Sequence, residues 1–303
     1  MSNALKICAV ILLLAASTAG CAEPIPLEYK FTKGEVSKYR ITLWVSLDLS
    51  ELAAASGKTI QPPTDVSLTM TMVQRTLAVN PDGSAKVRTV FTAPVVGGIK
   101  MPPSASKQAT ALLDQGIVTT ISKRGLPIAI HGVDKAMSSY GLQKIAVRKL
   151  LESTSATAFL PDGPMEVGQS WNASIPTPFN NSQIYMQTTL AGADEEIWNL
   201  GVARIRQTCT AKLDLKEIME GFLSAFAGKV KQGVPDLSST SGYVSANGQM
   251  THYFAPSIGK LLKSQGDLEV RISVTPPPGL APKGAPSTMA FGVNLRMAMT
   301  RFN

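Results

Sequence analysis

The chain has 303 residues, of which 44% are hydrophobic and 17% are charged, a composition that suits a folded core and excludes an intrinsically disordered protein. The formal net charge is +8, but the Lys and Arg residues are scattered rather than gathered in blocks. This pattern favours a generally solvated cationic surface over a nucleic-acid interface, so no nucleic-acid partner is expected. The length allows one large domain or two modest ones.

The first twenty residues predict a signal peptide. Lys6 supplies a positive charge, and an uninterrupted apolar run follows from Ile7 to Ala16. This run is too short to cross a bilayer, which takes roughly 20 apolar residues. A basic start, a short apolar run and small residues after it are typical of a secretory signal. We therefore predict export, with residues 1–20 as the signal peptide.

Cys21 is the candidate lipidation site. The segment Thr18-Ala19-Gly20-Cys21 resembles the box of bacterial lipoproteins, Leu-Ala/Ser-Gly/Ala-Cys, in which the Cys is acylated. Thr18 departs from the usual Leu, and the other three positions match. The resemblance implies a membrane partner, contacted through several acyl chains on Cys21. The alternative is ordinary cleavage near Ala19 or Ala22, after which Cys21 is removed or remains a thiol.

Two further residues bear on this alternative. Ala22 is not the Asp that retains such lipoproteins in the inner membrane, so the resemblance implies an outer-membrane location, facing the periplasm or the cell surface. Cys209 can form a disulfide with Cys21 only if Cys21 is a thiol. Because Cys209 lies in an apolar-alternating segment, we expect a buried, inert thiol there.

The first strand pair is predicted between Val66 and Val96. The segments Val66–Val79 and Ser84–Val96 alternate apolar and polar residues, the period of half-buried strands. Between them, Asn80-Pro81-Asp82-Gly83 is a strong turn sequence, because Pro fixes φ and Asp-Gly accepts the next turn positions. The sequence therefore predicts a β-hairpin.

The same pattern recurs in the second half and predicts an internal duplication. The segments Ser182–Gly192 and Gly201–Leu213 form another strand pair, and seven positions of the second strand match residues 83–93 in type and spacing. The preceding segments, 31–36 and 165–171, are also alike. A break near residues 153–163 divides the mature chain into a first β-rich half, 21–152, which includes a bridging helix, and a second, 153–303.

Further strands and three helices complete the prediction. Two more hairpins are expected at Gly116–Ile130 and Gly248–Lys263, turning at Gly125 and Gly259, and the chain should end in long strands. These are Gly266–Thr275 and Ser287–Arg301. Helices are expected within 104–115, 134–152 and 214–230, the last one capped by Asp214 and Glu217. The predicted fold class is α+β, mostly antiparallel β, with two similar curved-sheet halves that each carry a packed helix.

Three motifs resemble a known family. They are Leu160-Pro-Asp-Gly-Pro164, Val167-Gly-Gln-Ser-Trp171 and Tyr29-Lys-Phe31-Thr-Lys-Gly34-Glu35. They are similar to the "Pro-x-Gly-Pro…Val-Gly-x-Ser-Trp" stretch and the opening "Tyr-x-Phe-x-x-Gly-Glu" strand of a family of uncharacterised exported bacterial β-rich lipoproteins. That family implies no activity and no site residue beyond the lipidated Cys. More distantly, strand-rich halves that wrap a helix resemble the half-barrels of lipoprotein carriers, which hold acyl chains.

No pattern of catalytic, cofactor-binding or metal-ligating residues stands out. His131 and His252 are each placed singly at an expected strand end, without the spacing of a metal site. Ser170 lacks the second Gly of a nucleophile elbow. The acidic run Asp194–Glu196 is expected in a solvated turn of the second hairpin. Trp171 is expected in the core.

Methionines suggest what a non-enzymatic protein could bind. Met is adaptable and can line promiscuous apolar sites as well as fill a core. The methionines concerned are Met70, Met72, Met137, Met186, Met219, Met250, Met289, Met297 and Met299. The sequence therefore favours a non-enzymatic cell-envelope lipoprotein that binds a lipid or another apolar ligand. The alternatives are a structural or assembly protein that binds envelope proteins, and a secreted hydrolase with a dispersed site.

Overall fold

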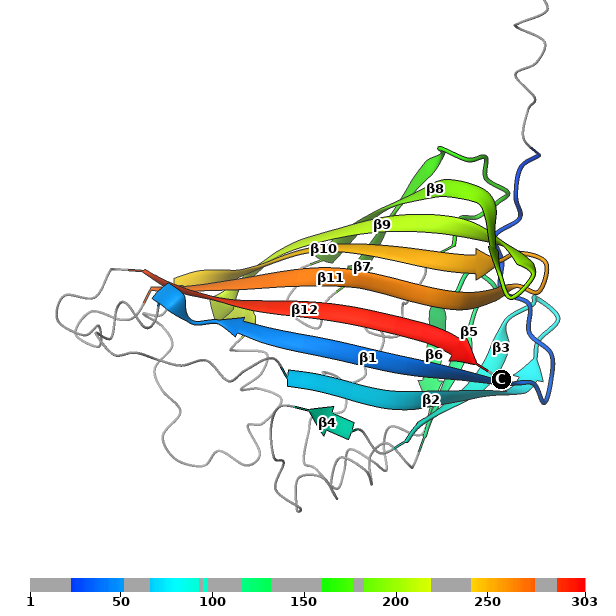
Figure 1. The fold of residues 1–303 in the computed structure, drawn as a ribbon, viewed down its shortest axis with the longest axis horizontal. Helices are drawn as coiled ribbons and strands as arrows, with labels where there is room; N and C mark the ends of the chain where they lie inside the picture. The colour runs from blue at the N-terminus through cyan, green and yellow to red at the C-terminus, as the bar shows by residue number, and fades with distance from the viewer. Residues whose placement is uncertain are drawn as a thin grey trace, which may run out of the picture.

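The computed structural model describes residues 23–51, 66–92, 95–97, 116–131, 160–176, 183–218, 241–275 and 288–302. Within these ranges the chain forms one antiparallel sheet of twelve strands (Figure 1). The strands are β1 (Val36–Asp48), β2 (Val66–Val79), β3 (Ala85–Phe91), β4 (Val95–Gly97), β5 (Ile117–Ile121), β6 (Pro127–His131), β7 (Ser170–Pro176), β8 (Gln183–Ile197), β9 (Leu200–Asp214), β10 (Ser241–Ala255), β11 (Lys260–Thr275) and β12 (Met289–Phe302).

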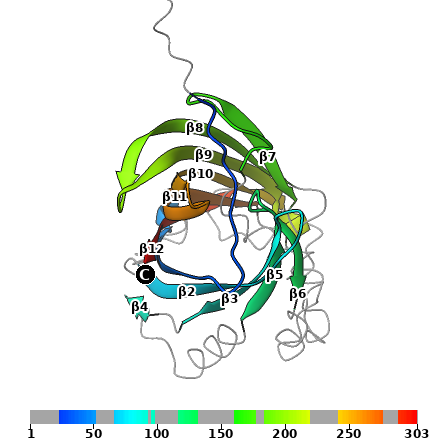
Figure 2. The same ribbon diagram turned by 90° about the vertical axis from the view of Figure 1, so that its right-hand side faces the viewer.

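Across the sheet, the strand numbers fall from β6 to β1 and then from β12 to β7. The order is β6-β5-β3-β2-β1-β12-β11-β10-β9-β8-β7, with β4 paired to β2 off this path. The last strand pairs with the first, from Lys38↔Phe302 to Asp48↔Gly292. The sheet curls around its concave side, so that β7 lies on the same side as β5 and β6 while β8 lies across from β2 and β3 (Figure 2). The expected two similar curved-sheet halves are not confirmed as units, because the β1–β12 pairing joins residues of both halves into one sheet.

Turn chemistry explains the first hairpin, which confirms the prediction. Gly83 has φ 81°, which a side chain would disfavour, and its amide donates to the Asn80 carbonyl at 3.0 Å. Asp82 Oδ1 accepts from the Ser84 amide at 2.9 Å and from its hydroxyl at 2.7 Å. The hairpins that turn at Gly125 (φ 83°) and Gly259 (φ 62°) also form. The long strand expected at Gly266–Thr275 is the continuation of β11 rather than a separate element.

The second hairpin turns later than expected. Asp194, Glu195 and Glu196 lie within β8, where Glu195 Oε1 pairs with Arg204 at 2.5 Å. The turn is made by Trp198 (φ 54°) and Asn199 (φ 62°), both in the left-handed region. Two such residues match a type I′ turn, whose twist suits a two-residue hairpin connection. The acidic residues therefore lie in a strand rather than in a turn. The ion pair between Glu195 of β8 and Arg204 of β9 balances one of their charges.

Most of the predicted helices lie outside the described residues. The segments expected at 104–115 and 134–152 are both outside, and of the segment at 214–230 only the start is described. There, Asp214 Oδ1 accepts from the amides of Lys216 at 2.7 Å and Glu217 at 3.3 Å, as an N-cap does. Within the described ranges, helical residues are confined to 50–51 and 215–218. The described fold is thus mostly β, without a helix packed on either half.

Matching turns precede β1 and β7. Gly34 (φ 84°) donates to Thr76 of β2 and Gly168 (φ 93°) donates to Leu190 of β8, at 2.9 and 2.7 Å. In each case the β2 or β8 residue donates back to the residue after the glycine. Each of those next residues also donates to the residue three positions earlier in the chain. This shared geometry is what a duplication would produce, and the duplication itself stays a prediction.

The two faces of the sheet differ in chemistry. Side chains alternate between faces along a strand, and directly paired residues share a face. Tyr39, Ile205, Phe254 and Met299 come from different strands but pack in one buried cluster, so they mark the concave side, here called the inner face. Starting from these residues, the alternation along each strand and the pairing between strands assign every other position to one face. The charged side chains of β1, β2, β9 and the middle of β11 thereby fall on the outer face.

An extended N-terminal segment closes one end of the curl. Residues 25–34, here called the crossing segment, run across the mouth of the sheet from the β7 side to β2 (Figure 2). Their backbone groups bond to Met165, Lys123, Gly259 and Thr76 in turn. Leu27 is 3% exposed and joins the buried cluster, with Tyr29 packed against it. The crossing segment therefore ties both sides of the sheet together at this closed end.

None of the helical stretches in the described ranges has the length and apolar character that crossing a membrane requires.

Candidate functional site

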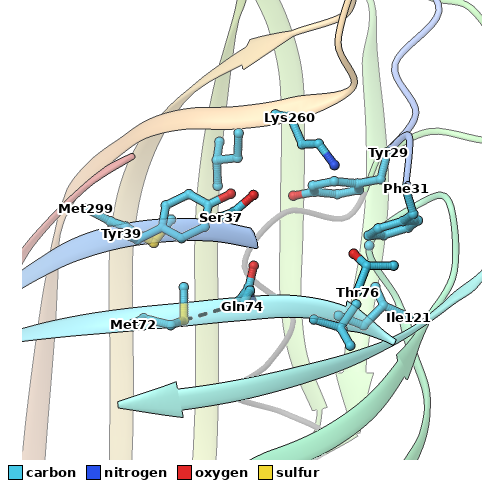
Figure 3. Close-up of a pocket in the computed structure, with 13 residues that line it drawn as sticks. Tyr29, Phe31, Ser37, Tyr39, Met72, Gln74, Thr76, Ile121, Lys260 and Met299 are labelled. Carbon is cyan, nitrogen blue, oxygen red and sulfur yellow. Dashed lines mark hydrogen bonds between the residues drawn. The ribbon is translucent and has the colours of Figure 1, made fainter. Parts of the chain in front are cut away.

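A small cavity of about 80 Å³ lies at the closed end, beneath the crossing segment (Figure 3). Tyr29 and Phe31 of that segment form one side of the cavity, and Ser37 and Tyr39 of β1 face them. The remaining lining residues come from β2, β3, β5, β11, β12 and the β5–β6 turn. They are Met72, Gln74, Thr76, Val87, Ile121, Gly125, Lys260, Leu261 and Met299. The cavity thus borders the core on one side and a polar group of residues on the other.

Hydroxyl groups dominate the polar lining. Burial raises the pKa of Tyr29, and the nearby Tyr39 raises it further. Burial likewise raises the pKa of Tyr39, while Arg301 and a hydrogen bond with Ser37 oppose that effect. Both phenols therefore remain protonated at neutral pH and can donate hydrogen bonds into the cavity. Gln74 bonds weakly, through Nε2, to Met72 Sδ at 3.9 Å.

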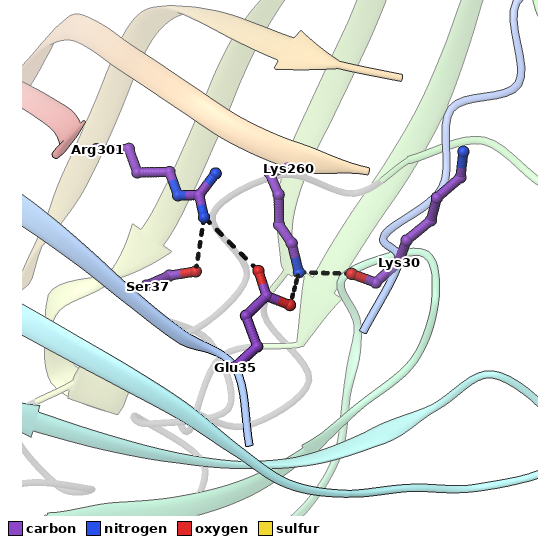
Figure 4. Close-up of polar contacts among 5 residues, drawn as sticks. All are labelled: Lys30, Glu35, Ser37, Lys260 and Arg301. Carbon is purple, nitrogen blue, oxygen red and sulfur yellow. Dashed lines mark hydrogen bonds and ion pairs between the residues drawn. The ribbon is translucent and has the colours of Figure 1, made fainter. Parts of the chain in front are cut away.

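A cluster of three charged residues borders the cavity (Figure 4). Lys260 Nζ donates to Glu35 Oε2 at 2.8 Å and to the backbone carbonyl of Lys30. Arg301 Nη2 lies 3.6 Å from the other oxygen, Glu35 Oε1, and 3.4 Å from Ser37 Oγ. The Lys260 side chain is only 9% exposed. The Glu35 carboxylate thus faces one ammonium group and one guanidinium group, so the cluster has one positive charge in excess.

Away from the closed end, the inner face is apolar. The register places Leu43, Val45 and Leu47 of β1 on it, beside alternate residues of β2 and β12. Those residues are Val66, Leu68 and Met70 on β2, and Phe291, Val293, Leu295 and Met297 on β12. The alternate residues Leu268, Val270, Ile272 and Val274 of β11 continue the surface. All of these side chains are half-buried. On β1, β2, β11 and β12, the only inward charges are Lys260 and Arg301, both at the closed end.

The methionines singled out from the sequence gather on this face. By register, seven of them point inward, namely Met70, Met72, Met186, Met250, Met289, Met297 and Met299. Met137 and Met219 lie outside the described residues. Met186 and Met299 are buried, and the other five are half-buried. Flexible thioether side chains from β2, β8, β10 and β12 therefore lie on the concave surface.

Two larger open hollows lie on the outer face. They measure about 420 and 360 Å³ and share Trp44, Asp267 and Arg296 among their lining residues. Arg296 Nε pairs with Asp267 Oδ1 at 3.1 Å, and both side chains are more than two-thirds exposed. Such an exposed pair contributes little stability or ligand affinity. The inner face and its closed end are the better candidate for a binding site.

His252 belongs to a buried polar ladder across four strands. Its Nδ1 pairs with Ser264 Oγ of β11, and its Nε2 lies 3.4 Å from Gln207 Oε1 of β9. Gln207 Nε2 in turn donates to Thr188 Oγ1 of β8 at 3.3 Å. Burial lowers the pKa of His252 to about 4. The expected strand-end position is thus corrected to a fully buried position inside β10.

This ladder does not form a hydrolase site. A catalytic His–Ser pair needs a carboxylate to stabilise the imidazolium and a hydroxyl that a substrate can reach. The partner of His252 is the amide of Gln207, and Ser264 is 1% exposed. His131 ends β6 and lies 3.4 Å from Thr120 Oγ1. Among the described residues, no three His, Cys, Asp or Glu side chains are grouped closely enough to hold a metal ion.

The other residues named from the sequence are dispersed. Cys21 lies outside the described residues. Cys209 is half-buried on the inner face with a free thiol, and burial raises its pKa. Ser170 begins β7 and its hydroxyl bonds to Thr189 Oγ1 at 2.7 Å. Trp171 packs against the buried cluster, as predicted.

Sequence reasoning missed the closed end. The stretch Tyr29–Glu35 was expected to be a strand, but it forms the end of the crossing segment and the turn before β1. Glu35 and Lys260 are 225 residues apart in the chain, and no local pattern pairs residues at that distance. One signal was available in the sequence of β12. Its inward-facing alternate positions are all apolar except Arg301, and such a charge among apolar residues marks a candidate site.

Comparisons with known proteins give no family and a distant structural similarity. No protein-family model matches the chain, and a search of curated proteins finds no match. Among solved structures, the chain is similar to one titled "Lipid-protein interactions in lipovitellin", with a TM-score of 0.48 and 10% sequence identity. The match covers 90% of this chain and 26% of that one, so this chain spans about a quarter of its length. No family assignment follows from these comparisons.

Proposed function

We propose that this protein is an exported, lipid-anchored protein of the bacterial cell envelope that binds a lipid or acyl chain on its inner face. The observation that carries the proposal is the separation of apolar and charged side chains onto opposite faces of the sheet. Alternate residues of β1, β2, β11 and β12 present a continuous apolar surface on the concave side, while the charges of these strands face outward except for Lys260 and Arg301 at the closed end. A curved, half-buried apolar surface rich in Met suits a flexible hydrocarbon ligand.

The curvature favours an apolar ligand over a protein partner. A docking surface for folded proteins is expected as a flat exposed patch on a filled core. Here the large exposed apolar side chains, such as Trp44 and Tyr185, are scattered over the sheet. The apolar surface instead follows the inside of the curl, where residues from distant strands face one another (Figure 2). The crossing segment closes one end of this surface, which gives a bound chain a fixed end point.

A pair of variants on one strand tests the binding site. Leu295 faces inward between Val45 and Leu268, whereas its neighbour Asn294 faces outward. In Leu295→Arg, a bound chain meets a charge, so we expect at least about tenfold weaker binding of a fluorescent fatty-acid probe. Asn294→Arg carries the same added charge on the other face and should bind the probe like wild type.

Leu295→Met keeps the inner face apolar and should also retain affinity, which separates the effect of charge from that of any change in packing. Circular dichroism and urea unfolding establish that the variants remain folded. Equal probe affinity in Leu295→Arg and Asn294→Arg, both folded, contradicts the proposal. So does the absence of probe binding by the wild-type protein.

The envelope location rests on Cys21 and is tested separately. The intact mass of the protein from its native membrane fraction should exceed the mass of the cleaved chain by several acyl chains. Cys21→Ala should lose that excess and appear in the soluble exported fraction. An unmodified wild-type chain in the soluble fraction contradicts anchoring, and a Cys21–Cys209 disulfide would then be sought.

A further inference from the structure

The cavity at the closed end is lined by several polar side chains and lies next to a charged cluster. Its side chains include Tyr29, Ser37, Tyr39 and Gln74, whose polar groups converge on one space (Figure 3). Ser37 Oγ already bonds to Arg301, and Gln74 Nε2 bonds weakly to Met72 Sδ. Hydroxyl and amide groups that face a cavity can also bond to water or to a ligand inside it. The volume of about 80 Å³ suits a few water molecules or a carboxylate group.

The charge next to the cavity is positive. Lys260 lines it and has three N–H donors, while the described residues supply two acceptors, Glu35 and the Lys30 carbonyl. The ammonium also lies 5.4 Å from the ring centre of Phe31. Glu35 neutralises one of the two cations, Lys260 and Arg301, and leaves the other in excess. A bound carboxylate would balance this charge in surroundings with little water, where the attraction is strong.

The cavity adjoins the apolar inner face. Met72 and Met299 line its inner side, and each lies opposite a β1 residue, Tyr39 and Ile41 respectively. The next inward positions on the same strands are Met70 and Met297, where the apolar face begins. From Met299 at the cavity to Phe291 at the far end of this face, β12 extends about 26 Å, at about 3.3 Å per residue. An acyl chain could therefore lie along β12 with its head in the cavity, with the two methionines adjusting around it.

We propose that the cavity binds the carboxylate of a free fatty acid whose hydrocarbon chain lies along the inner face. This inference rests on the proposed function and specifies its ligand. Tyr29 and Lys260 donate hydrogen bonds to the carboxylate, and the crossing segment covers it. The small volume excludes the bulky head group of a phospholipid. The site therefore selects single-chain acids over neutral or large-headed lipids.

Displacement of a fluorescent acyl probe by three competitors tests the inference. The competitors are palmitate, hexadecanol, which has the same chain without the charge, and a lysophospholipid with a large head group. Wild type should prefer palmitate to hexadecanol by about tenfold or more, because a charge-assisted hydrogen bond contributes that much. Tyr29→Phe and Lys260→Met should each reduce this preference to about twofold or less. Lys263→Met, on the outer face of the same strand, should leave it unchanged.

The wild-type comparison needs no variant and decides the question even if Lys260→Met fails to fold. Equal displacement by palmitate and hexadecanol would mean that the cavity holds only water, which overturns the inference and leaves the proposed function standing. Stronger displacement by the lysophospholipid also overturns it. If no competitor displaces the probe and none binds directly, the proposed function itself fails.

Discussion

Lowering the pH from about 7.5 to about 4.5 should destabilise the protein through His252. Burial lowers the pKa of this imidazole from 6.5 to about 4 in the folded protein. Between these two values the unfolded chain binds a proton that the folded chain does not. The free energy of unfolding therefore falls as the pH falls through this window, and is unaffected by this residue above it.

The structure sets the size of the effect. His252 is 0% exposed, and its hydrogen-bond partners among the described residues, Ser264 and Gln207, are both neutral, so neither of them stabilises the charged form. Each pH unit within the window costs about 1.4 kcal/mol, which gives a loss of roughly 2.5 kcal/mol by pH 4.5. His252→Gln keeps a donor and an acceptor at this position but cannot be protonated in this range.

Urea unfolding of both proteins across this pH range isolates the residue. Carboxylates that titrate in the same range contribute equally to wild type and variant, so the difference between the two curves reports His252 alone. We expect the wild type to lose roughly 2.5 kcal/mol relative to the variant between about pH 7.5 and about pH 4.5. Parallel stability profiles would refute the reasoning, since they would mean that His252 is not held neutral by burial.

Three further substitutions should change the urea midpoint in predictable directions. Trp198→Asn should stabilise the protein by about 0.5–1 kcal/mol, because Asn tolerates the left-handed turn conformation better; a lower midpoint would contradict this. Glu35→Gln should destabilise it by about 2 kcal/mol, since Lys260 and Arg301 lose their shared carboxylate, and an unchanged midpoint would argue against the cluster. Gly248→Val should destabilise it by about 2 kcal/mol, because a Cβ there would lie 2.7 Å from the nearest side-chain atom; wild-type stability would show that the strands can move apart.

Local signals predicted much of the sheet. The period-two alternation and the Asn80–Gly83 turn identify β2 and β3, and Gly125 and Gly259 mark turns that do form. These features depend on a few consecutive residues, so a single sequence contains them. The second hairpin shows the limit of this approach. Trp198 and Asn199 have no glycine to mark the turn, so the acidic residues before them looked like the connection.

Long-range pairing could not be predicted in the same way. The β1–β12 ladder joins the two ends of the chain, and both strands have the same alternating pattern as their neighbours. Many pairings would satisfy that pattern equally well, so the sequence did not distinguish one sheet from two. The site depends on the same closure, because Glu35 lies at the start of β1 and meets Arg301 of β12 only once these strands pair. The methionines were recognised as candidates, but their common face follows from the register.

Photo-crosslinking with a diazirine-labelled fatty acid tests the central claim most directly. With the diazirine near the carboxylate, the account predicts labelling around Met72 and Met299. With the diazirine at the far end of the chain, labelling should move toward Leu47 and Phe291, at the other end of the inner face. Peptide mass spectrometry locates each adduct. Labels on outward residues such as Trp44, or labels whose position does not depend on where the diazirine is placed, would contradict the account.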